Sequence, residues 1–200
     1  MAVHPAKRVA LIDPVGVKAG MDHYDLLLAN GFSAEGVQVI LYSNFKREES
    51  GTPVHQYFFN TNVAKLSAIA SNFFGTLKAF RNAQQQGISW IIVHIFRAGF
   101  FDLVTLTLAR LMGLKICAII HDIEGLDTYT LPLIRNRVLH QLPTIRVVHN
   151  DYCKSELERQ PGNRNTPTAV IPHVHFKHLF TGYQKTPELL QQLRNNQSIS

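Results

Sequence analysis

Short apolar runs recur along the chain, and longer segments with helical spacing lie between them. Most runs are apolar at consecutive positions rather than at alternate ones, which is typical of strands buried on both faces of a parallel sheet. We therefore predict strands at residues 8–13, 37–42, 89–96, 115–120, 145–149 and 168–172.

The segments between these runs predict helices at residues 21–34, 62–86, 100–112 and 151–160. In the second helix, Gly75 is a point where the helix can divide into two pieces. Asp151 is the expected N-cap of the last helix. Because strands alternate with helices, we expect right-handed βαβ units. The predicted fold class is α/β, a Rossmann-like three-layer domain with a mostly parallel sheet.

The composition fits one large domain. The chain has 200 residues, of which 46% are hydrophobic and 17% charged, so there is enough apolar material for a core. After Pro172 the sequence becomes polar and ends in Asn195–Ser200, without another apolar run. We predict a domain over residues 1–176, followed by a polar linker or tail over residues 177–200.

The formal net charge of +6 at pH 7 favours an anionic partner. Nucleic acid is not expected, because no dense Lys/Arg block is interleaved with aromatic residues. Two cysteines, Cys117 and Cys153, do not suggest a disulfide framework, which favours the cytosol. No apolar stretch approaches the roughly 20 residues of a membrane span, so membrane contact is expected to be peripheral.

Ligands of open α/β sheets bind outside the carboxyl ends of the strands, so the residues that follow each strand are the candidate site. The loop after the first strand contains Gly16 and Gly20, where the backbone can approach a ligand closely and the next helix begins. A plain β-to-α turn remains the alternative for this loop.

Histidines lie at or just after the carboxyl ends of four of the predicted strands, and each could equally be a structural side chain. The strongest candidate is His121 with Asp122, because an imidazole can contact a sugar hydroxyl and a neighbouring carboxylate can orient it. The remaining candidates for ligand binding at this edge are His94, Arg97, Glu124, His149 and His173.

A metal site is not expected. His173 and His175 alternate along an extended segment and His178 follows, but no Cys, Asp or Glu nearby completes a ligand set.

Two groups of basic residues are weak indications of an anionic surface. Lys65, Lys78 and Arg81 flank the apolar stripe of the predicted helix 62–86, which is either a core-facing helix with a solvated rim or a face for anionic lipid. The second, looser group consists of Arg135, Arg137, His140 and Arg146.

The order and spacing of these segments resemble the amino-terminal domain of retaining GT-B glycosyltransferases of family 4, over most of residues 8–176. The resemblance is carried by the opening strand and glycine loop and by four further segments. These are the helix ending in Leu28-Ala-Asn-Gly31-Phe, then Ile120-His121-Asp122, Val148-His-Asn-Asp-Tyr152, and Val170-Ile-Pro-His173.

The resemblance implies one half of a GT-B enzyme that moves a sugar from a nucleotide-sugar donor to a glycan, lipid or other acceptor. In that family the amino-terminal domain holds the acceptor, and a carboxyl-terminal domain holds most of the donor. His121 matches the histidine that contacts the transferred sugar, and Gly16 and Gly20 match the glycine loop near the donor phosphates or the acceptor. Catalysis needs no metal ion, and no other cofactor is implied. Segments 43–56 and 125–143 are expected loops around the acceptor.

The sequence departs from the family in two ways. Ala19-Gly20 stands where the family often has paired glycines, and the donor domain is not present. We therefore expect the chain alone to be inactive, as a truncated protein or one subunit of a split enzyme. Two alternatives remain open: a non-catalytic module that docks a partner, another copy or a membrane, and a standalone nucleotide-binding α/β enzyme.

Overall fold

The computed structural model describes residues 7–19, 21–44, 54–59, 65–123, 131–162 and 166–172. The strands are β1 (Lys7–Asp13), β2 (Val37–Ser43), β3 (Val54–Tyr57), β4 (Trp90–Ile95), β5 (Lys115–Ile120), β6 (Ile145–Val148) and β7 (Thr168–Val170). The helices are α1 (Met21–Ala34), α2 (Lys65–Gln85), α3 (Phe100–Leu111), α4 (Pro132–Asn136) and α5 (Asp151–Arg159). A 3-10 turn, η1 (Gly16–Ala19), precedes α1, and a π-helical turn, η2 (Arg137–Gln141), continues α4.

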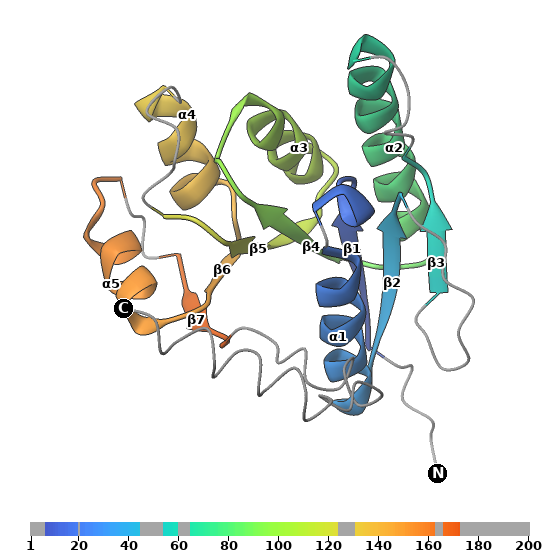
Figure 1. Ribbon diagram of the computed structural model, residues 1–200, viewed down its shortest axis with the longest axis horizontal. Coiled ribbons are helices and arrows are strands. Elements are labelled where there is room, and N and C mark those ends of the chain that lie inside the picture. Colours follow the sequence, from blue (N-terminus) through green and yellow to red (C-terminus); the bar gives the residue numbers. More distant parts are fainter. Residues whose placement is uncertain are drawn as a thin grey trace, which may run out of the picture.

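The strands form one seven-stranded sheet in the order β3-β2-β1-β4-β5-β6-β7, and every neighbouring pair is parallel (Figure 1). The Rossmann-like α/β prediction is confirmed. Leu11 of β1 lies opposite Leu41 of β2 on one side and Ile92 of β4 on the other. The chain runs outward from β1 to β3 and then returns to place β4 beside β1. The strand order therefore reverses between β1 and β4, which is where ligands bind in such sheets.

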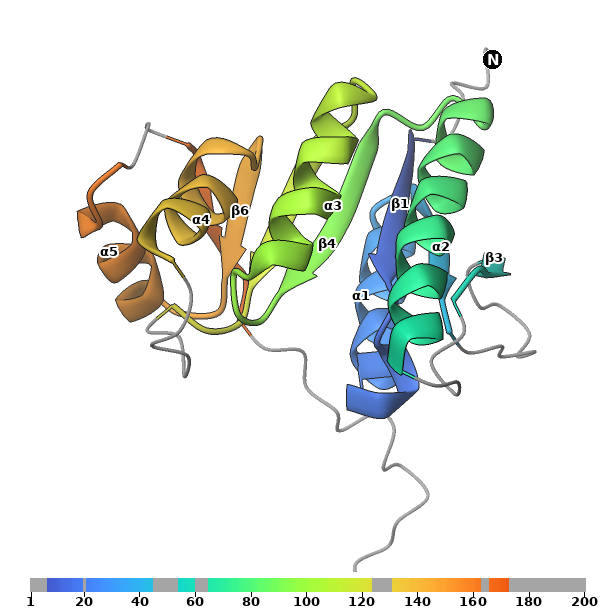
Figure 2. The same cartoon turned by 90° about the horizontal axis from the view of Figure 1, so that it is seen from above.

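The two faces of the sheet are covered unequally. Helices α2, α3, α4 and α5 lie on one face (Figure 2), where they bury a core that includes Ala10, Phe80, Ile91, Leu106 and Leu157. Among the described residues, α1 is the only helix on the other face, and the buried cluster there is smaller. Because successive side chains of a strand point to opposite faces, continuous apolar runs supply both clusters.

The predicted loops and the predicted N-cap of the last helix differ from the structure. The segments expected as loops, 43–56 and 125–143, contain the start of β3 and all of α4 and η2. Asn150, not Asp151, is the N-cap of α5, because its side-chain oxygen accepts the N–H of Cys153 at 2.7 Å. Asp151 occupies the first turn, where a carboxylate also favours the helix dipole.

Gly75 does not divide the second long helix, since α2 runs unbroken from Lys65 to Gln85. The glycine serves packing instead. A Cβ at this position would lie 2.6 Å from the carbonyl oxygen of Phe58 and 2.6 Å from the ring of Phe59. Gly75 therefore lets α2 approach the segment that follows β3.

Candidate functional site

The loop after β1 is held by its own side chains. Asp13 Oδ1 accepts the N–H of Val15 at 3.0 Å, and Asp13 Oδ2 accepts the N–H of Gly16 at 2.9 Å. Asn44, after β2, accepts the N–H of Val17 at 3.2 Å. Gly16 is buried and has a φ of 43°, a backbone conformation that favours glycine. Because three successive N–H groups are already bound within the protein, they are not available to cradle a phosphate.

A row of three histidines crosses the carboxyl ends of β4, β5 and β6. His94 Nε2 lies 2.9 Å from Asp25 Oδ1, and His94 Nδ1 lies 2.9 Å from His121 Nε2. His121 Nδ1 is 3.3 Å from His149 Nε2, and His149 Nδ1 is 3.0 Å from the carbonyl oxygen of Ile171. We call His94, His121 and His149 the histidine row. Its two ends are a buried carboxyl group of α1 and a backbone carbonyl beyond β7.

Aromatic rings pack around the histidine row. The ring of Tyr24, from α1, presents edge contacts to all three imidazoles at centroid distances of 5.5, 5.6 and 6.0 Å. Phe96 stacks on His121 at 4.6 Å with an interplanar angle of 11°. The side chain of His94 is 2% exposed and His149 is 8% exposed, whereas His121 is partly exposed. The His121 residue is therefore more exposed than His149.

Two buried carboxyl groups lie at the inner end of the row. Burial raises the pKa of Asp25 to about 7, and burial together with the charge of Asp25 raises the pKa of Asp13 to about 7. Burial lowers the pKa of His94 to about 4. The Asp25–His94 contact has the geometry of an ion pair, but desolvation disfavours both charged forms, so we assign it as a neutral pair with the proton on Asp25.

Asp25 also interacts with Asp13 side chain to side chain. Asp25 Oδ2 has no donor among the described residues in the hydrogen-bond geometry. Two carboxyl groups share a hydrogen bond only when one of them carries a proton, so the contact between Asp13 and Asp25 requires a protonated carboxyl group. The raised pKa values and the contact therefore support the same protonated pair.

A crevice of about 190 Å³ opens between α2 and α3 at the switch point between β1 and β4. Its polar lining consists of Asp13, Asn72, Thr76, His94, Asp102 and Thr105. Asp102 Oδ2 accepts the N–H of Gly99 at 2.8 Å, and burial raises the pKa of this carboxyl group. Hydroxyl, amide and carboxyl groups of this kind bind neutral hydroxylated ligands better than they bind phosphates.

The connection from β4 to α3 approaches the same crevice. Ala98 is buried and has a φ of 50°, a strained conformation for a residue other than glycine. The strain sits between Arg97, which is exposed, and Gly99, which is the N-cap of α3. Strained backbone of this kind concentrates at ligand sites, and here it falls beside the switch point.

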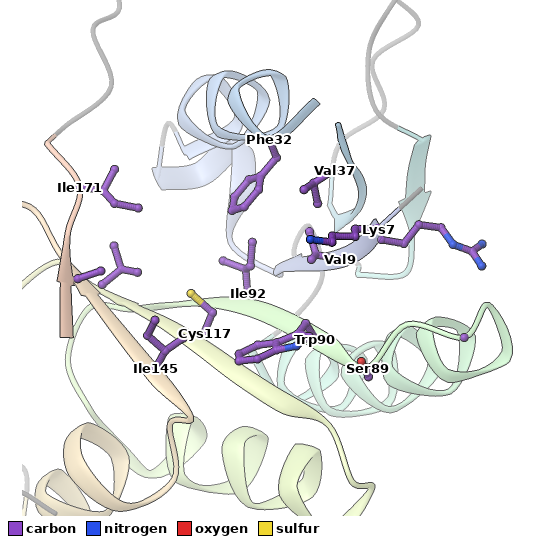
Figure 3. Close-up of a pocket in the computed structure, with 14 residues that line it drawn as sticks. Lys7, Val9, Phe32, Val37, Ser89, Trp90, Ile92, Cys117, Ile145 and Ile171 are labelled. Carbon is purple, nitrogen blue, oxygen red and sulfur yellow. The ribbon is translucent and has the colours of Figure 1, made fainter. Parts of the chain in front are cut away.

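The α1 face of the sheet carries a separate, apolar groove of about 820 Å³. Figure 3 shows Phe32 of α1 facing Ile92 and Cys117 across this groove. Ile171 lies at its edge, one residue past the strand β7. Since His94 follows Ile92 by two positions, the groove and the histidine row share one face of the sheet. The groove exists because α1 alone covers this face among the described residues.

The structure brings three of the predicted site residues together, namely His94, His121 and His149. Asp122 lies beside His121 and is partly exposed, and Gly16 lies in the loop that Asp13 holds. Both ring nitrogens of His121 contact other imidazoles. Gly20, Glu124, His173, His175 and His178 lie outside the described residues.

Two members of the second basic group, Arg146 and His140, are buried. Arg146 is fully buried and donates to His140 Nδ1 at 2.8 Å, to the carbonyl oxygen of Thr166 at 2.7 Å and to Thr168 Oγ1 at 3.0 Å. His140 is buried too, and that burial lowers its pKa. These two residues tie η2 and β6 to the segment leading into β7.

Sequence reasoning missed Tyr24 and Asp25 as site residues. The signal was the position of Asp25: Met21, Tyr24, Leu28 and Ala29 form the buried stripe of α1, and Asp25 stands within that stripe. A carboxyl group on the apolar face of a helix needs a partner, and here the partner is His94.

Within the described ranges, no helix is long and apolar enough to cross a membrane. In the same part of the chain, no three His, Cys, Asp or Glu side chains are arranged to hold a metal ion.

No protein-family model matches the chain, and no curated protein matches its sequence. The structure is similar to a glycosyltransferase from Rickettsia africae, with a TM-score of 0.60 and 15% identity, covering 98% of this chain and 51% of that one. It is also similar to UGT2 of Phytolacca americana, solved with UDP-2-fluoro-glucose and pterostilbene, with a TM-score of 0.59, 12% identity and coverage of 94% and 57%.

A third similar structure is a UDP-glucosyltransferase from Polygonum tinctorium, with a TM-score of 0.54, 10% identity and coverage of 96% and 57%. The chain thus spans about half the length of these solved structures. At such low identities the likeness shows the fold, a Rossmann-like domain that matches one half of a GT-B glycosyltransferase.

Proposed function

We propose that this chain is the acceptor-side domain of a glycosyltransferase, of the retaining family 4-like type, that works together with a separate donor domain. The observation that carries the proposal is the convergence of the histidine row and the Asp13 loop at the switch point of a sheet that matches half of a GT-B enzyme. The whole reaction transfers a sugar from a nucleotide-sugar to an acceptor hydroxyl.

The chemistry of the edge supports an acceptor more than a nucleotide. Phosphates are bound by free N–H groups and cations. Here the N–H groups of Val15, Gly16 and Val17 are already used, and the carboxyl groups of Asp13 and Asp102 line the crevice. An acceptor hydroxyl can instead donate to a carboxyl oxygen or share a hydrogen bond with an imidazole. His121, which is more exposed than His149, is the residue that we assign to this contact, with Asp122 beside it.

The experiment has two steps. The chain alone is first titrated with UDP-, GDP- and ADP-sugars while the ligand signals are followed by NMR. We expect no binding, because the diphosphate site belongs to the donor domain. A two-domain protein with this chain as its amino-terminal half is then assayed with the same donors, and we expect sugar transfer to a glycan or lipid acceptor.

Each step can contradict the proposal. Clear nucleotide-sugar binding by the chain alone would favour a standalone nucleotide-binding α/β enzyme. No transfer by the two-domain protein across all donors would count against a glycosyltransferase. In that protein, His121→Gln is expected to lower transfer by at least about tenfold, equivalent to the loss of one hydrogen bond. His23→Gln, on α1 but outside the row, serves as the matched control.

The apolar groove favours a second candidate function, a non-catalytic module that docks an apolar segment of a partner polypeptide. Ile171 at the groove is 38% exposed, and Leu111 on the opposite face is 80% exposed. If the groove docks a partner, the chain self-associates or captures an apolar helical peptide, and Ile171→Glu abolishes this while Leu111→Glu does not. A chain that remains monomeric, ignores such peptides and does not bind anionic liposomes contradicts this function.

A further inference from the structure

The crevice between α2 and α3 combines hydrogen-bonding side chains with an aromatic wall. Its amide, hydroxyl and carboxyl groups include those of Asn72, Thr76, Asp102 and Thr105, and Phe101 forms part of its wall. The volume of the crevice is about 190 Å³, whereas sites for drug-sized ligands measure about 300–1,000 Å³. The crevice therefore has room for one small ring rather than for an extended ligand.

Thr76 places a buried hydroxyl group in this crevice. The residue is 3% exposed, and its Oγ1 lies 3.5 Å from Asn72 Oδ1, at the outer limit of a hydrogen bond. Buried hydroxyl groups normally have a closer partner, because a poorly bonded polar group costs stability. A ligand hydroxyl in the crevice supplies such a partner, since hydroxyl groups both donate and accept.

Asp102 presents a second polar group from the first turn of α3. Its Oδ2 accepts the N–H of Gly99, the N-cap of the helix, at 2.8 Å. A carboxyl group has about four acceptor sites, so Asp102 can accept a ligand hydroxyl while it holds Gly99. The strained turn at Ala98, with its φ of 50°, sets the position of this end of α3 beside the crevice.

Phe101 gives the crevice an apolar wall that remains accessible. It is 55% exposed although it lines the crevice, whereas its neighbour Phe100 is 63% exposed and lies outside that lining. The centroids of the two rings are 6.3 Å apart, in an edge contact at 72°. The electron-rich face of an aromatic ring attracts C–H groups. A saturated ring can therefore pack on Phe101 while its hydroxyl groups reach the polar side chains.

The charges of the crevice disfavour an anionic ligand. Asp13 and Asp102 both line it, and none of the described residues in its lining is Lys or Arg. His94 lines it too but stays neutral, because burial lowers its pKa to about 4. A phosphate here meets two carboxyl groups and no cation. An alkyl chain leaves the polar groups without hydrogen bonds. A neutral ring with several hydroxyl groups and a C–H face avoids both costs.

We propose that this crevice binds one neutral pyranose ring, which packs on Phe101 and forms hydrogen bonds with Thr76 and Asp102. The inference rests on the proposed function, because it names the acceptor as a glycan rather than a lipid or another alcohol. Phe96 lines the crevice and also stacks on His121 at 4.6 Å. The bound ring therefore lies beside the residue that we assign to the acceptor hydroxyl.

The site is tested with the 200-residue chain alone. The methyl signals of Thr76 and Thr105 are followed by NMR while methyl glucoside, methyl galactoside or methyl mannoside is added. We expect at least one glycoside to shift both signals, with a Kd of about 1–10 mM, as ligands of this size reach. The 1-phosphates of the same sugars and hexanol are the comparison ligands. We expect neither to shift the signals at the same concentrations, and nucleotide-sugars fail for the same reason as the 1-phosphates.

Two pairs of variants separate a ring site from nonspecific contact. Phe101→Ala removes the wall and is expected to weaken glycoside binding about tenfold, whereas Phe100→Ala changes it less than about twofold. Thr76→Val removes the buried hydroxyl with little change of shape and is expected to weaken binding about fivefold, with Thr105 as the reporter. Thr107→Val, on α3 but outside the crevice lining, is its matched control.

Three outcomes overturn the site. They are no shift with any glycoside well above millimolar concentration, tighter binding of a sugar 1-phosphate or hexanol than of the glycosides, and unchanged binding in Phe101→Ala. The Phe101 pair decides the matter if Thr76→Val does not fold. The result is separate from the proposed function. Glycoside binding by a chain whose two-domain form transfers no sugar leaves the site standing. Transfer without glycoside binding leaves only the glycosyltransferase standing.

Discussion

His94 Nε2 lies 2.9 Å from Asp25 Oδ1, and the two side chains are 2% and 0% exposed. One partner lies near the carboxyl end of β4, at the switch point of the sheet, and the other lies in the amino-terminal half of α1, the helix that covers this face. The contact therefore joins α1 to the carboxyl edge of the sheet, and its protonation bears on stability.

The pH dependence of stability is a direct test of this contact. Asp13 and Asp25 have folded-state pKa values of about 7, above the ordinary 3.8, so their contribution is complete below about pH 4 and is lost as the pH rises through 7. The pKa of His94 is lowered from the ordinary 6.5 to about 4. Its contribution to stability is therefore complete above about pH 6.5 and is lost as the pH falls toward 4.

Between about pH 4 and 6.5, these three groups make the folded chain bind one proton more than the unfolded chain does. Their joint contribution to the free energy of unfolding therefore falls as the pH rises, by about 1.4 kcal/mol per pH unit. Asp25→Asn removes that extra proton, because the proton gained by Asp13 then offsets the proton lost by His94. We therefore expect the free energy of unfolding of this variant to change little with pH across the same range. Urea unfolding of both proteins across this range measures the difference, and parallel pH profiles would contradict the assignment.

Removing the middle ring of the row should destabilise the fold. His121→Ala removes the ring that His94 Nδ1 and His149 Nε2 contact in a largely buried place. We expect a loss of about 1–3 kcal/mol in the free energy of unfolding, from the two lost ring-nitrogen contacts and a lost ring stack. Gln85→Ala, an exposed change on α2, should cost less than about 0.5 kcal/mol. Equal effects would mean that the row is not formed.

We expect the substitution of alanine for glycine to have opposite effects on stability at Gly75 and at Gly31, which both lie in helices. Gly75→Ala places a methyl group 2.6 Å from the Phe58 carbonyl and the Phe59 ring, so we expect destabilisation by about 1–3 kcal/mol. Gly31→Ala on α1 meets nothing within 4 Å and should stabilise the chain by about 0.5–1 kcal/mol. Thermal unfolding of the pair checks this packing, and a stabilising Gly75→Ala would show that α2 lies farther from β3.

Arg146 offers a comparison between a buried and an exposed arginine. Arg146→Lys loses the fork geometry that reaches His140, Thr166 and Thr168, so we expect destabilisation of about 2 kcal/mol or more. Arg159, whose side chain is 75% exposed and pairs with Glu156, should tolerate the same change within about 0.5 kcal/mol. Chemical denaturation distinguishes the two, and a neutral Arg146→Lys would contradict its structural role.

Much of the fold could be predicted because the strands of a buried parallel sheet leave a plain pattern. The runs at 8–13, 37–42 and 115–120 became β1, β2 and β5 within a residue. By contrast, β3 has the sequence Val-His-Gln-Tyr and leaves no apolar run, and α4 with η2 is too short for a helical period to stand out.

The sequence by itself determined the alternation of strands and helices, and with it the edge where His94, His121 and His149 had to gather. That follows from chain order, since parallel strands all end at one side of a sheet. Only the tertiary structure decided which nitrogen meets which partner, and that Asp25 closes the row. The reason is that α1 crosses over the face of strands far from it in sequence, so its register against them is fixed by packing rather than by local pattern.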